Sequence, residues 1–526
     1  MAAEISSTQI RFSPKRRGLR VPSAWTVSCF AVALVILTPI ITIVAFLFQS
    51  PSENWSHLSS TVLPEYIEHS LILMAGVTVG AGSIGVTAAW LTSMYRFPGR
   101  QFLSWALLLP LAMPAYIIAY TYTGMLDVSG PLQEWIRTEF NLQYGEYWFP
   151  QVRSIEGAVV MFSLVLYPYV YLLARAAFLE QSVCALEVSR TLGCNAWQSF
   201  YRVALPLARP AIVAGLSLAL METLADFGTV QYFGVGTFTT GIYRTWFGMN
   251  DATAAAQLSS LLMVFVFVLI VLERVSRRQA RYHHTTNRYQ ALPDVHLRTS
   301  QAILCSCVCF APLVLGFFVP VMQLVIWGVE TYGEMVDSSF VSLAANSFTL
   351  AASAAVLALI PALILAYGNR AQPSRTLRFF SRLSAMGYAI PGTVIAVGIL
   401  IPFGAIDNTL NQFFDQQFAY TPGLLFSGTV FILLFAYTVR FLAISLQTVE
   451  AGLGKIKPTM DDAARSMGLS NNGTLRSVHL PIMKGSLLTA TVIVFVDVLK
   501  ELPATLILRP FDFNTLAVRA YELASD

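Results

Sequence analysis

The chain has 526 residues, of which 56% are hydrophobic and only 12% are charged. This charged share is about half of what soluble globular proteins carry, and a soluble core could not bury so much apolar surface. The formal net charge of +4 would suggest nucleic acid binding in a soluble protein. Here, however, the basic residues gather at the ends of apolar segments, a pattern that reflects membrane topology. The composition therefore predicts a membrane protein with the lipid bilayer, and no nucleic acid, as its surroundings.

Eleven apolar segments have the length that a helix needs to cross a bilayer, about 20 residues at 1.5 Å per residue. The first one follows a basic cluster, as in a secretory signal peptide, but it is too long for one, so we expect an uncleaved helix. The sequence therefore predicts an all-α polytopic membrane protein. The segments cover residues 25–49, 68–94, 102–126, 155–178, 210–233, 256–273, 302–328, 344–367, 383–405, 423–446 and 484–508.

The loops between these segments alternate in charge. Positive charge marks cytoplasmic loops, and basic residues such as Arg96 and Arg375 lie in every second loop. The loops between them contain acids such as Asp127, which suits the outer face. We therefore expect a basic cytoplasmic N-terminus at residues 1–24 and a cytoplasmic linker at residues 274–301.

The two parts of the chain repeat a pattern at a constant distance, since 462 − 187 and 481 − 206 both give 275. Glu187, Arg190, Gly193 and Pro206 match Asp462, Arg465, Gly468 and Pro481, and Glu222, Asp226 and Arg244 match Asp497, Glu501 and Arg519. We therefore predict two parallel repeats of about six spans, at residues 25–273 and 302–526. A pseudo-two-fold axis along the membrane normal would relate them. A counterpart of the span at 256–273 would follow Asp526, so the repeat predicts a last helix that is missing from these residues.

The duplicated pattern is acid-x-x-Arg-x-x-Gly with a proline thirteen positions after the glycine. It resembles the EAA loop of ABC importer permeases, which in that family inserts into a groove of each ATPase subunit. The resemblance places such loops at residues 180–209 and 447–483. The first has Val188 and Ser189 where the family has two alanines, and the second begins with Asp where Glu is usual. The docking candidates are Glu187, Arg190, Gly193, Trp197, Phe200, Pro206, Asp462, Arg465, Gly468, Leu475 and Pro481.

The resemblance implies two ATPase subunits as partners. The sequence contains no phosphate-binding loop of the Gly-x-x-x-x-Gly-Lys-[Ser/Thr] type, so we expect ATP to be bound and hydrolysed on the partner subunits and no catalytic residue in this chain. An ion-coupled secondary transporter is the alternative from another class. It would need no docking element repeated at fixed spacing.

The local sequence of the loops predicts two short helices at an angle. Gly193 and Gly468 can end one helix in a left-handed conformation, and Asn195 or Ser470 can cap the next. In the first loop, Trp197 starts a series of apolar residues three or four positions apart that continues with Phe200 and Ala204. This face could be buried by a partner protein. An amphipathic helix on the membrane surface is the alternative.

Two further segments look like the fused permeases of ferric iron importers, and this resemblance extends over essentially the whole chain. They are Ala225-Asp226-Phe-Gly-Thr-Val-Gln-Tyr-Phe-Gly234, continuing to Arg244, and Lys500-Glu501-Leu-Pro-Ala-Thr-Leu, continuing to Arg519. The resemblance implies a bacterial inner-membrane permease that moves Fe³⁺ as its substrate and binds no cofactor. It also implies a substrate-binding protein on the outer face, where the loops at 127–154 and 234–255 could receive it. Thiamine permeases of the same fused architecture are the nearest alternative.

Four acids are candidates for the translocation pathway. Glu222 with Asp226, and Asp497 with Glu501, are spaced i, i+4, which places each pair on one helix face. Each acid at mid-bilayer would cost about 2.5–3.5 kcal/mol, so the four must face the interior or water. Carboxylates are ligands of hard cations, and the pairs could meet as a ring around the ion. Alternatively, these acids bond helix ends and loops near the outer surface, and Lys500 could neutralise Glu501.

Two other groups of residues could in principle ligate a metal. Tyr116 and Tyr120 share a helix face beside Pro114, but the second repeat has no such pair near Pro391, so we interpret the tyrosines as packing residues. The two prolines are expected to kink their helices where a gate could bend. On a helix, the C-x-C-x-C series of Cys305, Cys307 and Cys309 would point in different directions, so core packing is expected there.

Overall fold

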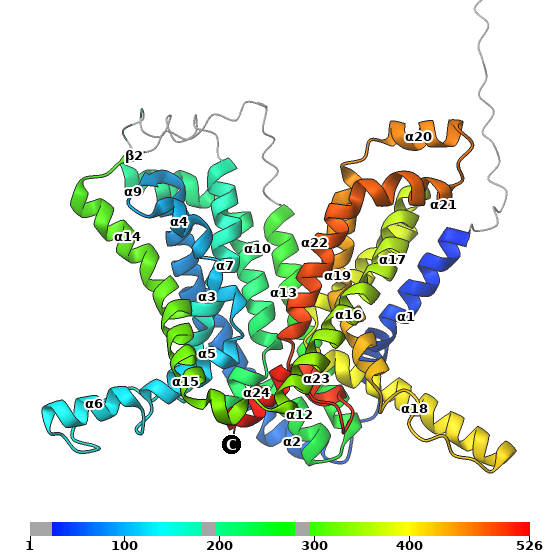
Figure 1. Ribbon diagram of the computed structural model, residues 1–526, viewed down its shortest axis with the longest axis horizontal. Helices are drawn as coiled ribbons and strands as arrows, with labels where there is room; N and C mark the ends of the chain where they lie inside the picture. The colour runs from blue at the N-terminus through cyan, green and yellow to red at the C-terminus, as the bar shows by residue number, and fades with distance from the viewer. Residues whose placement is uncertain (1–23, 181–190, 192, 194, 279–294, 526) are drawn as a thin grey trace, which may run out of the picture.

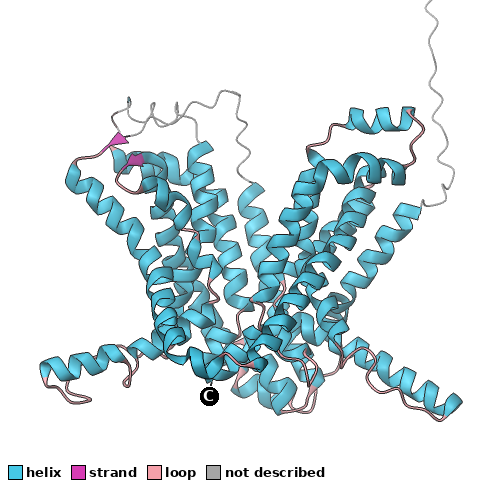
Figure 2. Cartoon of the chain, in the orientation of Figure 1, coloured by secondary structure: helices cyan, strands magenta, loops and turns pink. Residues whose placement is uncertain are grey.

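The computed structural model describes residues 24–180, 191, 193, 195–278 and 295–525. These residues are helical nearly throughout (Figure 2), which confirms the predicted all-α class. The helices of the first part are α1 (Ala24–Phe46), α2 (Trp55–Thr61), α3 (Leu63–Met94), α4 (Arg100–Ala106), α5 (Ala115–Leu126), α6 (Pro131–Phe140), α7 (Ile155–Glu180), α9 (Ala196–Ser199), α10 (Leu205–Ala225), α11 (Gly228–Tyr232), α12 (Phe238–Tyr243) and α13 (Ala252–Arg278).

The second part, residues 295–525, begins with α14 (Thr299–Leu313) and has the same kind of architecture. Its further helices are α15 (Val319–Met335), α16 (Ser338–Ala371), α17 (Arg375–Ser384), α18 (Gly392–Phe418), α19 (Val430–Gly454), α20 (Pro458–Ser466), α21 (Asn471–Thr474), α22 (Leu480–Leu499), α23 (Pro503–Leu508) and α24 (Leu516–Ser525). Short 3-10 or π-helical segments are η1 (Leu109–Ala112), η2 (Phe200–Ala204), η3 (Arg244–Gly248), η4 (Val314–Phe318), η5 (Ala385–Ala389) and η6 (Leu475–His479). Strands β1 (Tyr95–Arg96) and β2 (Val295–His296) pair in parallel.

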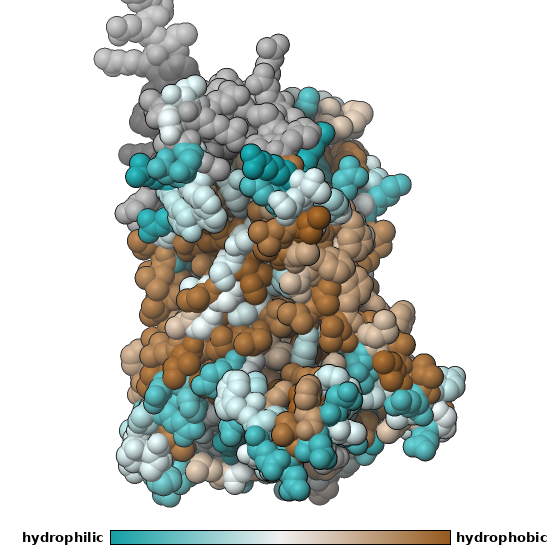
Figure 3. Space-filling view, turned by 90° about the vertical axis from the view of Figure 1, so that its left-hand side faces the viewer, coloured by the Kyte–Doolittle hydropathy of each residue, from teal (hydrophilic) through white to brown (hydrophobic). Residues whose placement is uncertain are grey.

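Within the described residues, ten helical segments are long and apolar enough to cross a membrane. An eleventh is added if residues Arg100–Ala112 and Ala115–Phe140 count as one span, which is bent by 90°. Figure 3 shows one side of the molecule, with an apolar band across its middle between two hydrophilic ends. The number of spans therefore agrees with the sequence prediction, although the predicted span at 102–126 is broken.

The two prolines that were expected to kink helices stand instead at helix starts. Pro114 and Pro391 have ψ angles of 138° and 142°, and they directly precede α5 and α18. Each follows a 3-10 segment, η1 or η5. Proline supplies no N–H and suits the position before or at a helix N-terminus, so the chain turns sharply there.

The helices of the two parts diverge toward one end of the molecule and approach each other at the opposite end (Figure 1). The diverging end carries α9, α20 and α21, and we call it the loop end. The opposite end contains α12, α23 and α24. Because the helix ends at the opposite end lie close together, residues of both parts can line a common space there.

The first helix of each part packs against the other part. α1 contacts α16, α17 and α18, whereas α14 contacts α3 and α4. The α1–α18 contact is close: a Cβ added to Gly398 would lie 2.6 Å from the carbonyl oxygen of Pro39. Glycine is therefore needed at this crossing, and the exchange of first helices ties the two parts together.

Candidate functional site

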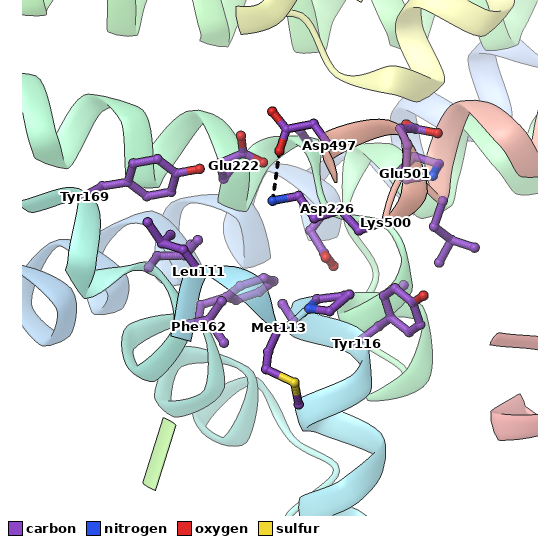
Figure 4. Close-up of a pocket in the computed structure, with 18 of the residues that line it drawn as sticks. Leu111, Met113, Tyr116, Phe162, Tyr169, Glu222, Asp226, Asp497, Lys500 and Glu501 are labelled. Atoms are coloured by element: carbon purple, nitrogen blue, oxygen red, sulfur yellow. Dashed lines mark ion pairs between the residues drawn. The ribbon is translucent and has the colours of Figure 1, made fainter. Parts of the chain in front are cut away.

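A polar pocket of about 130 Å³ lies between the two parts. Its walls come from α5, α7, α10 and α11 of the first part and from α19, η5 and the segment that joins α22 to α23. All four acids that the sequence singles out line it (Figure 4): Glu222, Asp226, Asp497 and Glu501. The fold thus brings together carboxylates that lie up to 279 residues apart, since 501 − 222 is 279.

Two of these acids act as caps of short helices. Asp226 follows the end of α10, and its Oδ1 accepts hydrogen bonds from N–H groups at the start of α11, at 2.9 Å from Thr229. Glu501 follows α22, and its carboxylate accepts from the N–H groups of Ala504 and Thr505 at the start of α23, at 3.1 and 3.2 Å. An acid at a helix N-terminus satisfies otherwise unpaired N–H groups. The predicted spans 210–233 and 484–508 therefore end early, at Ala225 and Leu499.

The other two acids bind side chains rather than backbone. The hydroxyl of Tyr388 donates to Glu222 Oε1 at 3.0 Å. Lys500 Nζ lies 3.0 Å from Asp497 Oδ1, so the lysine pairs with Asp497 rather than with its neighbour Glu501. Each pair of predicted pathway acids thus divides into one capping acid and one acid that sits on the transmembrane helix with its carboxylate toward the pocket.

Arg440 on α19 is a charged residue of the pocket that the sequence reasoning missed. Its side chain is 10% exposed, and Nη1 lies 3.5 Å from Glu501 Oε1. Its Nε and Nη1 atoms are buried without a hydrogen-bond partner in the described chain. The constant offset could have found it, because position 165 in the first part is a valine. Arg440 is thus a cation in only one of the two repeats.

The other candidate metal ligands are scattered. Among the described residues, no three His, Cys, Asp or Glu side chains come together closely enough to hold a metal ion. Tyr116 lines the pocket, whereas Tyr120 packs against Tyr232 and Trp327. On α14, Cys309 is buried and Cys307 is exposed, so the alternating cysteines face different directions, as predicted.

The duplicated loops lie at the loop end of the molecule. Glu187 and Arg190 of the first loop are outside the described residues. Gly193 and Gly468 both have a φ of +84°, the left-handed conformation that was predicted. Asn195 then accepts a hydrogen bond from Gln198 N–H, and Ser470 accepts one from Gly473 N–H, so both expected caps are present.

The predicted apolar face of the first loop is divided between two environments. Phe200 is 9% exposed and packs against Trp90 on α3 and Phe178 on α7. Trp197 is 70% exposed and stacks on the exposed Tyr201 at 5.9 Å. The prediction of one continuous face from Trp197 through Phe200 to Ala204 is therefore wrong, because helical spacing does not reveal which side chains their own chain already covers.

The second loop presents charges on its outer helix, α20. Asp462 and Arg465 are exposed and lie 3.7 Å apart. Leu475 is half-buried in η6, and Pro481 stands in the first turn of α22, as Pro206 does in α10. The two loops thus expose different chemistry, aromatic in the first and charged in the second.

An ionic cluster that the sequence reasoning also missed holds the second loop to its own part. Arg370 near the end of α16 binds both carboxylate oxygens of Asp461, at 2.9 and 3.1 Å, and donates to two backbone carbonyls that precede α20. The ring of His479, which is 1% exposed, lies 2.8 Å from Asp461. Burial raises the pKa of Asp461, but the hydrogen bonds from Arg370 and His479 outweigh it and hold that pKa below its ordinary value. At the constant offset, the first part has Tyr95, Leu186 and Ala204.

Comparisons with known proteins agree with this architecture. Residues 81–281 match the family model described as binding-protein-dependent transport system inner membrane component. The Fe(3+)-transport system permease protein FbpB 2 of Haemophilus influenzae is 27% identical over 474 residues, which cover 88% of this chain and 85% of that protein. The ferric transport system permease protein FbpB of Actinobacillus pleuropneumoniae is 25% identical over 90% of this chain and 68% of its own length. The sulfate transport system permease protein CysT of Escherichia coli is 29% identical over only 39% of this chain.

The matched segment 81–281 runs from the middle of α3 past the end of α13 and so contains the first duplicated loop. The long matches to fused permeases extend through the second part as well. Together with the ten membrane-spanning helices among the described residues, these findings show that the chain is a multi-pass inner-membrane permease of the binding-protein-dependent transport family.

Proposed function

We propose that this permease translocates ferric iron across the bacterial inner membrane. Its energy comes from two separate ATPase subunits, and its substrate comes from a binding protein on the outer face. The observation that carries the proposal is the pocket in which four carboxylates from both parts of the chain meet. The named function of the relatives that match nearly the whole chain supports the choice of ferric iron over thiamine.

Within the pocket, Glu222 and Asp497 are the acids that meet the ion. Their matched partners Asp226 and Glu501 are occupied by backbone N–H groups, so they hold the walls in place. Fe³⁺ is a hard cation that carboxylate and phenol oxygens suit, and Tyr388 places a hydroxyl beside Glu222. The passing ion takes the place of the cation of Lys500 at Asp497.

The two parts act as the two gates of an alternating-access transporter. We assign residues 25–273 and 302–526 as tandem permease halves, joined by a linker at 274–301. Matching elements start 275 residues apart: α7 and α19 at 155 and 430, η2 and η6 at 200 and 475, and α10 and α22 at 205 and 480. This regularity supports a pseudo-two-fold relation, in which rocking of the halves would open the pocket to one side at a time.

The loop end is the cytoplasmic end, and the loops at 180–209 and 447–483 each receive one ATPase subunit. In the first loop, the exposed stack of Trp197 on Tyr201 offers an aromatic anchor, a residue type enriched where proteins bind each other tightly. In the second loop, the exposed pair of Asp462 and Arg465 offers charged contacts. The N-terminus lies on the same side, because basic residues gather there.

Uptake of radioactive ferric iron into proteoliposomes tests the proposal. The vesicles contain the permease with its ATPase, and the binding protein is added outside. Glu222→Gln and Asp497→Asn should each reduce iron uptake at least tenfold while the amount of inserted permease is unchanged. Asp415→Asn, which removes a carboxylate from the exposed end of α18, serves as the matched control and should transport normally. Wild-type uptake by the Glu222 and Asp497 variants together, or transport of thiamine instead of iron, would refute the proposal.

A further inference from the structure

A second, larger cavity of about 1170 Å³ lies between α13 of the first part and α17 of the second. Arg274 lines it from α13, and Arg375, Arg378 and Arg382 line it from α17. The three arginines of α17 are spaced i, i+3 and i+7, so they share one face of that helix. Four guanidinium groups from both parts thus surround one space that the translocation pathway does not use.

The charge of this cavity is not neutralised within the described chain. None of the four arginines lies within 4.0 Å of a carboxylate of the described residues. One acid, Glu273, lines the cavity as well, and Glu450 on α19 interacts with Arg382 at longer range. Four positive side chains and one negative one leave a formal lining charge of +3. The cavity therefore favours an anion.

Below the arginines, the cavity wall becomes apolar. Phe267 and Val271 on α13 are 56% and 40% exposed, and Phe379 on α17 is 60% exposed. Phe267 and Val271 precede Arg274 by seven and three residues on the same helix. At 1.5 Å per residue they lie about 5–10 Å deeper along the membrane span than the arginine. A charged rim above an apolar floor matches the polarity of a phospholipid.

We propose that this cavity binds an anionic phospholipid. The phosphate group lies among the arginines, and an acyl chain covers Phe267, Val271 and Phe379. A basic pocket between transmembrane helices on the cytoplasmic side is a known way to hold anionic head groups. A free phosphate would leave the exposed phenylalanines uncovered, which favours the lipid over a small anion. The bound lipid joins α13 to α17 and thus bridges the two parts of the chain.

Native mass spectrometry and thermal unfolding of the purified full-length permease test the proposal. We expect phosphatidylglycerol to remain bound in the mass spectrum and to raise the unfolding temperature, whereas phosphatidylcholine has little effect. The triple variant Arg375→Gln, Arg378→Gln, Arg382→Gln should weaken phosphatidylglycerol binding on the order of 100-fold, given the contribution of each basic residue near anionic lipid. The variant Phe379→Ser should weaken it less, with the charges intact.

A charge-matched control removes three exposed lysines of the second part, in the variant Lys455→Gln, Lys457→Gln, Lys484→Gln. It should bind phosphatidylglycerol like the wild type. Equal loss of lipid in this control would show a general charge effect and overturn the site. So would wild-type lipid binding by the arginine variant, or equal stabilisation by soluble glycerol phosphate, which would indicate a small-anion site. Protection of the arginines by the ATPase alone would identify a protein contact instead.

Discussion

Replacing Arg370 by methionine should release the second loop from its own part of the chain. The change removes both contacts to Asp461 and the donors to two backbone carbonyls, while the flexible methionine keeps much of the side-chain volume. Arg370 and Asp461 are only 17% and 15% exposed, and breaking a buried pair costs about 3–5 kcal/mol. We take the lower end, about 3 kcal/mol, which corresponds to an increase of roughly 100-fold in local opening.

Hydrogen exchange read by mass spectrometry over residues 455–475 measures this opening directly. The amides of this segment should exchange roughly 100-fold faster in Arg370→Met. Arg465→Met is the matched control, because its ion pair with Asp462 is exposed and such pairs contribute about 0–1 kcal/mol. It should change the rates by less than about fivefold. Similar exchange rates in the wild type and in Arg370→Met would refute the reasoning.

The same cluster predicts a dependence on pH. The folded protein holds the pKa of Asp461 below its ordinary value of 3.8. A carboxyl group with a lowered pKa stabilises the fold above its unfolded-state pKa, and this contribution is lost as the pH falls through the folded-state value. Exchange of the segment 455–475 should therefore stay slow down to about pH 4 and accelerate below it. In Arg370→Met this acid-induced step should be reduced, and an unchanged step would contradict the assignment to Asp461.

Three further predictions concern the loops and the pocket. Gly193→Val and Gly468→Val place a β-branched residue at φ +84°, which is strained, so transport and ATPase stimulation should fall with insertion intact; normal values in both would argue against docking at these loops. Trp197→Ala removes an exposed aromatic anchor and should weaken ATPase binding by about 2 kcal/mol or more, measured by titration, and an unchanged affinity would exclude it. Asp226→Asn should lower thermal stability by about 1–3 kcal/mol, whereas Glu222→Gln should lower iron uptake without this loss; the reverse outcome would exchange their roles.

The membrane spans and the turn geometry of the loops could be predicted from the sequence because both depend on local properties. Apolar segment length sets a span, and a glycine followed by a capping residue sets a turn. Gly468 and Ser470 show this, with the expected φ and the expected hydrogen bond. The docking roles of these residues stay predictions.

Other features depend on contacts that spacing does not determine. Glu222 and Asp226 were assigned to one helix face, yet the helix ends between them because Asp226 caps α11. Phe200 and Trp197 have helical spacing, yet only one of them is covered by Trp90 on α3. The cluster around Arg370 could have been suspected, since the constant offset places Tyr95 at the matching position of the first part. Its partners could be identified only from the structure.

The exchange of first helices imposes an order on the synthesis of this protein. α1 ends at Phe46, but its neighbour α16 begins only at Ser338, and 338 − 46 is 292 residues. At about 5–20 residues per second, a ribosome needs roughly 15–60 s to make them. During that time the newly inserted α1 has none of its three main neighbours of the second part to pack against. It must stay in the lipid or beside the insertion machinery, and the rate at which the ribosome completes α16 to α18 limits how soon a nascent permease can close around it.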